Sequence, residues 1–295
     1  MSTASTLPAE QIDAQAKSKT SAASFRSPTP KAAKLQPKEH GAYAILGIPI
    51  ATSLLIASPT ISGCCIAVAA IAGFLAHEPL LIASGKRGKR AKQNTPHATN
   101  RLAILLSIVI ASGLTAVATG TTSVRIALFG CGLLAAGFFG LTILDIERQA
   151  SSGGVALSRT FGGQLGGVIG LSVPCLPILL AGGFGVWHSI AVWSVWLVGF
   201  FSTTIAVRGV IAAQKRKSRV VHWTSVIALS LTTAVWVAIG HPFVISVVPM
   251  LLMSCYLLVD PPPAKYIKRV GWALVAGTMV SAVWLSILAM RFGDI

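Results

Sequence analysis

The stretch Thr60–Lys92, TISGCCIAVAAIAGFLAHEPLLIASGKRGKRAK, decides the fold of this chain. Residues 60–83 are almost entirely apolar, whereas residues 86–92 contain five lysines and arginines. A helix of about 20 apolar residues spans the hydrocarbon core of a bilayer. Cations directly after such a helix are typical of a cytoplasmic loop. The stretch therefore predicts a transmembrane helix that ends in the cytoplasm.

Eight other apolar stretches of similar length accompany it. Only 11% of the residues are Asp, Glu, Lys or Arg, against about 25% in soluble domains, so much of the surface must face lipid. The stretches lack the alternation of apolar and polar residues that marks barrel strands. The predicted fold class is all-α, a polytopic transmembrane helix bundle of about nine helices. The predicted spans are 41–58, 60–83, 102–119, 124–144, 161–183, 186–207, 220–239, 242–259 and 270–290.

The lysines and arginines give the bundle a predicted orientation. With nine spans and the N-terminus inside, 22 of the 24 lie on the cytoplasmic side, and only Arg125 and Arg291 lie outside. The positive-inside rule selects this arrangement, with the C-terminus outside. The net charge of +16 is thereby assigned to orientation in the lipid bilayer, with no nucleic-acid partner. The predicted location is the cell inner (plasma) membrane, with multiple passes.

The chain divides into a tail and one membrane domain. Residues 1–36 are rich in Ala, Ser, Thr, Lys, Gln and Pro and are expected to form a flexible basic cytoplasmic tail. Residues 37–295 are expected to form a single transmembrane helical domain. The cysteines lie inside apolar runs, where they are interpreted as small buried residues, and no metal site or cofactor is assigned. They are Cys64, Cys65, Cys131, Cys175 and Cys255.

Uncommon polar groups gather on the side predicted to be cytoplasmic. Ionisable residues at membrane depth are costly, so they usually line a cavity or pair with one another. The sequence therefore predicts a polar site on this side. The candidates for catalysis are His40, His77, Glu78 and Arg208, and those for substrate binding are Glu39, Lys86, Arg87, Arg148, Arg159 and Gln164.

His77 and Glu78 are the strongest of these candidates, because they lie within an apolar run. A carboxylate at that depth needs a cationic or hydrogen-bonded partner. The expected partners are Arg208, Arg159 and Arg148. Three interpretations stay open: an ion pair that locks helices together, a site for a polar substrate, and a metal or proton site.

The span 161–183 has features of its own. The pairs Gly162/Gly166 and Gly163/Gly167 have the small-xxx-small spacing that lets helix backbones approach closely. We expect this helix in the centre of the bundle. Pro174 and Pro177 predict a kink in the same span.

The chain resembles the YwiC-like family of bacterial membrane proteins over roughly residues 37–290. Tyr43 stands where the family usually has Trp. The resemblance implies a membrane protein but no particular reaction, so whether the protein is an enzyme is left undecided. The matching blocks are Pro37-Lys38-Glu39-His40-Gly41-Ala42-Tyr43-Ala44, Phe74-Leu75-Ala76-His77-Glu78-Pro79-Leu80-Leu81, Gly85-Lys86-Arg87-Gly88, Arg90-Ala91 and Val207-Arg208.

The architecture is also similar to that of UbiA-type intramembrane prenyltransferases, which have nine helices and a cytoplasm-facing polar cavity. The Asp-rich pattern that holds magnesium and diphosphate in that family is absent here. Our first hypothesis is a cytoplasm-facing site for a small polar, anionic or lipid-linked molecule. A UbiA-like lipid-modifying enzyme is the second, and it would require a cavity that joins His77 and Glu78 to Arg208 and opens to lipid. A small-molecule transporter is the third.

Overall fold

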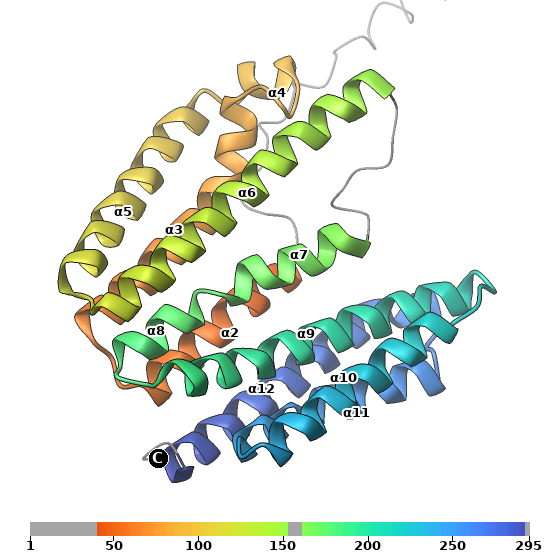
Figure 1. The fold of residues 1–295 in the computed structure, drawn as a ribbon. Helices are drawn as coiled ribbons and strands as arrows, with labels where there is room; N and C mark the ends of the chain where they lie inside the picture. The colour runs from red at the N-terminus through yellow and green to blue at the C-terminus, as the bar shows by residue number, and fades with distance from the viewer. Residues whose placement is uncertain (1–39, 153–160, 293–295) are drawn as a thin grey trace, which may run out of the picture.

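The computed structural model describes residues 40–152 and 161–292, and all regular structure in these ranges is helical (Figure 1). The predicted all-α class is therefore confirmed. The predicted tail 1–36, Glu39 and Arg159 lie outside the described residues. The helices are α2 (His40–Ile56), α3 (Ile61–Ala83), α4 (Lys89–Gln93), α5 (His97–Thr119), α6 (Thr122–Ser152), α7 (Phe161–Ser172), α8 (Cys175–Ala181), α9 (Val186–Gln214), α10 (Val220–Ala238), η2 (Pro242–Val247), α11 (Val248–Val259), η3 (Ala264–Tyr266) and α12 (Ile267–Phe292).

Seven of these helical segments are long and apolar enough to cross a membrane. Two shorter apolar helices, Gly41–Ile56 and Thr122–Phe138, coincide with the first and fourth predicted spans. The protein is therefore a helical protein with several candidate membrane spans. The seven are Ile61–Ala83, His97–Thr119, Gly162–Ala181, Val186–Gln214, Val220–Ala238, Pro242–Val259 and Arg269–Arg291.

The long helices alternate in direction, so that their connections gather at two ends of the bundle (Figure 1). We call one of them the basic end: it carries the connections 84–96, 215–219 and 260–266. The opposite end carries the α5–α6 and α8–α9 connections and the end of α12. Within the described residues, the three cation-containing connections thus lie at the same end of the bundle.

Helix α9 is the core of the bundle. In an apolar 18-residue stretch of α9, 67% is buried inside the protein, against 6% in the corresponding stretch of α5 and 11% in that of α10. Trp196 of α9 and Met250 of α11 are completely buried. A Cβ atom added to Gly199 would overlap the Met250 side chain, so this glycine lets α9 and α11 pack closely. The centre of the bundle is thus α9, rather than the glycine-rich helix that we expected there.

The glycine-rich span 161–183 is two helices. α7 ends at Ser172 and α8 begins at Cys175, with Pro174 between them, so the predicted kink is confirmed. The prediction of close backbone approach needs correction. A Cβ atom on Gly166 would overlap the Phe138 ring of α6, and one on Gly167 would meet nothing within 4 Å. The small residue at position 166 accommodates an aromatic side chain of the neighbouring helix.

A tighter backbone contact occurs where α8 ends. A Cβ atom on Gly182 would overlap the carbonyl oxygen of Ala57, and a backbone atom cannot move away as a side chain can. We expect Gly182→Ala to reduce the free energy of unfolding by about 1–3 kcal/mol, the usual cost of overpacking. Gly167→Ala is the matched control and should change it little. Thermal unfolding in detergent measures both, and equal effects would contradict this packing.

Candidate functional site

The basic end of α3 carries a buried carboxylate. Glu78 is only 6% exposed, and it lies one turn before the helix ends at Ala83. Next to it, Pro79 lies inside the helix and has no backbone N–H to donate. A buried carboxylate without a partner costs several kcal/mol, so the local structure must supply a cation or donors.

The chain supplies that cation by turning back after α3. Gly85 and Gly88 have φ values of 75° and 95°, which side chains other than glycine rarely adopt. The amide of Arg87 donates to the carbonyl of Leu81 at 3.2 Å, so the turn is fixed against the end of the helix. The segment Gly85-Lys86-Arg87-Gly88 therefore forms a tight turn that reverses the chain after α3.

This turn places Arg87 on Glu78. Its Nε donates to Glu78 Oε2 at 3.2 Å, and its Nη2 donates to Oε1, so the pair is bidentate. The Arg87 side chain remains 45% exposed, whereas that of Glu78 is 8% exposed. The partner that the structure gives Glu78 is thus Arg87 and not the expected Arg208, whereas Arg159 and the side chain of Arg148 lie outside the described part of the chain. The cation comes from nine residues further along the same segment, because the glycine turn folds it back.

A ring contact shows how the start of α2, where His40 lies, sits relative to the end of α3. Tyr43 of α2 and Phe74 of α3 meet edge to face, with centroids 5.0 Å apart. Position 40 lies three residues before Tyr43, and His77 lies three residues after Phe74. Because α2 and α3 run in opposite directions, both positions lie about one turn closer to the basic end. The backbone at position 40 and the partly buried His77 are thus at similar levels of adjacent helices.

The other predicted binding residues divide into two groups. Lys86 lies in the glycine turn and is partly buried. Arg208 of α9 donates from Nε to Gln164 Oε1 of α7 at 2.7 Å, so the structure brings these two candidates together. The position of Arg148 lies near the end of α6. The described residues thus form two polar pairs at the basic end, Glu78–Arg87 and Gln164–Arg208.

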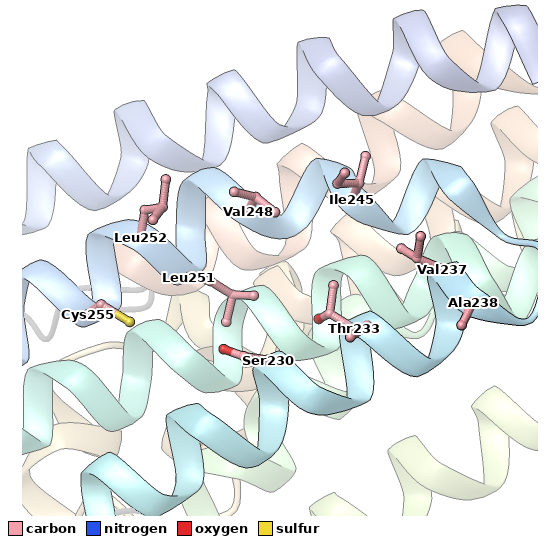
Figure 2. A pocket seen from close by; sticks show the side chains of 10 residues that line it. Ser230, Thr233, Val237, Ala238, Ile245, Val248, Leu251, Leu252 and Cys255 are labelled. Atoms are coloured by element: carbon pink, nitrogen blue, oxygen red, sulfur yellow. The ribbon is translucent and has the colours of Figure 1, made fainter.

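A groove lies elsewhere, between α10 and the η2–α11 segment (Figure 2). Its volume is about 520 Å³, and its lining is almost entirely apolar. The hydroxyls of Ser230 and Thr233 donate to carbonyls of their own helix at 3.0 Å, so they present little polarity to it. The groove contains neither of the two polar pairs. It is lined by Ser230, Thr233, Ala234, Val237, Ala238, Ile245, Val248, Leu251, Leu252 and Cys255.

The fold and these pairs define a class, a helical protein with several candidate membrane spans and paired polar side chains at one end. Within that class, residues 36–157 match the family model described as YwiC-like protein. The resemblance is thereby confirmed over a segment that is less than half of the chain and contains both histidine motifs. The Val207-Arg208 block lies outside it. The searches of curated proteins and of solved structures gave no match.

The Glu78–Arg87 pair can be tested by a double-mutant cycle. Arg87→Gln leaves a buried carboxylate without its cation, so we expect a larger loss of unfolding free energy than for Glu78→Gln. The double variant should lose less than the sum of the two, with a coupling of about 1–2 kcal/mol because Arg87 is half exposed. Lys92→Gln, an exposed cation of the same connection, should cost under about 0.5 kcal/mol. Additive effects of the two substitutions in chemical unfolding would contradict the pair.

Proposed function

We propose that the protein crosses the cell inner (plasma) membrane nine times and binds a small polar or anionic molecule at the cytoplasmic ends of α2 and α3. Support for the nine crossings comes from the seven candidate spans, the two shorter apolar helices and the alternating helix directions. The 17 residues of α2 extend about 25 Å, close to the roughly 30 Å of the hydrocarbon core.

The orientation follows from the basic end. Its connections contain Lys86, Arg87, Arg90 and Lys92 after α3, with further cations after α9 and α11. Cations near the ends of spans are retained in the cytoplasm. This orientation directs the Glu78–Arg87 pair toward the cytoplasm.

The topology predicts which positions can be labelled from outside. In a chain without its native cysteines, Arg90→Cys should react with a membrane-impermeant maleimide only after the cells are opened. Ser123→Cys, in the first turn of α6 at the opposite end, should react in intact cells. Both positions are exposed. Labelling of position 90 in intact cells would overturn the orientation.

The observation that supports the binding proposal is that Arg87 is both held in position and partly exposed. One edge of its guanidinium is fixed by the buried Glu78 carboxylate, while the side chain remains 45% exposed. A positioned, partly exposed guanidinium is suited to donate hydrogen bonds to a carboxylate or phosphate. Lys86 precedes Arg87 in the turn, and His77 precedes Glu78 in α3. Glu78 acts here as a positioning residue.

The prenyltransferase alternative has less support. It requires a cavity that joins His77 and Glu78 to Arg208, and the groove of Figure 2 contains none of these residues. Its apolar lining also offers no cation to a diphosphate.

The binding proposal can be tested by identifying what the protein retains. Full-length protein purified in detergent is denatured, and the released small molecules are compared by mass spectrometry. We expect a polar or anionic compound in the wild type that falls about tenfold or more in Arg87→Gln, because a hydrogen bond to a charged group is lost. Glu78→Gln should also lower retention, since Arg87 loses its anchor.

Lys92→Gln is the control, because it removes an exposed cation from the same connection while leaving the pair intact. Its retention should equal that of the wild type. The proposal fails if the wild type releases no such compound, or if Arg87→Gln releases it in the same amount.

A further inference from the structure

A second concentration of positive charge lies where α9 turns into α10. We call the α9–α10 corner the set Arg208, Lys215, Arg216, Lys217, Arg219 and His222. Lys215, Arg216 and Lys217 are exposed, whereas Arg219 and His222 are partly buried. The corner belongs to the basic end, but its residues come from different helices than the Glu78–Arg87 pair.

Arg219 is held in place by a neutral acceptor. Its Nη1 donates to the carbonyl oxygen of Leu258 at 2.7 Å, in the last turn of α11. This contact caps the negative end of that helix dipole but leaves the full positive charge without a carboxylate. Asp260, two residues beyond Leu258, is exposed and forms no ion pair within 4.0 Å with the described cations.

His222 packs against α9 with one of its two nitrogens buried. An added Cβ atom on Gly209 would lie 3.5 Å from His222 Cβ and 3.6 Å from Cγ, so the imidazole rests against the bare backbone of α9. Its Nδ1 is buried and has no hydrogen-bond partner. A neutral imidazole has one donor and one acceptor nitrogen. We infer that the buried Nδ1 is the acceptor nitrogen, because an unpaired lone pair there is less costly than an unpaired N–H. The proton, and hence the donor, is then on Nε2.

The charges of both Arg208 and Arg219 act on this imidazole. His222 is the third residue of α10, so it lies at the level where a span meets the aqueous phase. Arg208 is next to Gly209, against which His222 packs, and Arg219 lies three residues before His222. The three exposed cations Lys215, Arg216 and Lys217 lie in the turn between them. This set of donors matches a phosphate group, whose oxygens accept several charge-assisted hydrogen bonds.

We propose that the α9–α10 corner is a phosphate-binding site, independent of the site at α2 and α3. The phosphate belongs either to the headgroup of a phospholipid in the adjacent leaflet or to a soluble phosphate compound. Both share the chemistry that Arg219 and His222 recognise, and the experiment separates them.

The test uses the full chain purified in a maltoside detergent, which contains no phosphate. One arm titrates inorganic phosphate by calorimetry, and the other measures retention of added phosphatidylglycerol by native mass spectrometry. Arg219→Gln should weaken binding about tenfold or more, and His222→Gln should weaken it several-fold. Binding in the first arm identifies a site for soluble phosphate, and binding in the second arm alone identifies a lipid-headgroup site.

Arg269→Gln is the matched control. It removes a guanidinium at the same end, which lies over the Tyr266 ring at 5.0 Å, outside the corner. If it weakens binding as much as Arg219→Gln does, the effect is general surface charge and the proposal is overturned. A wild type that binds neither probe overturns it as well. Should Arg219→Gln not fold, Arg219→Lys retains a donor for Leu258, and His222→Gln alone decides the question.

Discussion

The cost of placing charge in hydrocarbon is the constraint on which the rest of this structure depends. A lysine, arginine or aspartate at the centre of a membrane helix costs about 2.5–3.5 kcal/mol even on the most lenient scale. In the described residues, the connections 84–96, 215–219 and 260–266 hold many of the cations, and all three connections lie at the basic end. The largely apolar stretches of the long helices then pack through Trp196, Met250 and other apolar side chains around α9.

Glu78 is the instructive exception, since it is the buried carboxylate of the described residues. The same constraint explains the turn that follows it. A helix continued past Ala83 would carry Arg87 away from Glu78 into water. The positive φ values of Gly85 and Gly88 reverse the chain instead, and they bring the guanidinium back within hydrogen-bond distance. The two glycines thus allow Arg87 of the same segment, rather than a cation of another helix, to neutralise the carboxylate.

The sequence predicted those features that follow from composition along the chain. Apolar length and cation placement gave the helices and the basic end, and Pro174 gave the break between α7 and α8. It did not predict that Arg87 pairs with Glu78 or that Phe138 fills the space at Gly166, because both depend on where the backbone goes in three dimensions. Two predicted spans were also too short. α6 and α9 continue beyond the apolar runs into polar residues, where hydropathy gives no signal.

The two cationic places at the basic end differ in how their charge is balanced. At α3 the acceptor of Arg87 is the Glu78 carboxylate, which cancels the positive charge of the guanidinium. What this site offers a ligand is therefore a fixed arrangement of hydrogen-bond donors. At the α9–α10 corner the acceptor of Arg219 is the carbonyl of Leu258, which orients the guanidinium but cancels none of its charge. Fixed donors with uncompensated charge attract an anion more strongly than an internal ion pair does. The corner is therefore expected to select by charge, and the α2–α3 site by shape and hydrogen bonding.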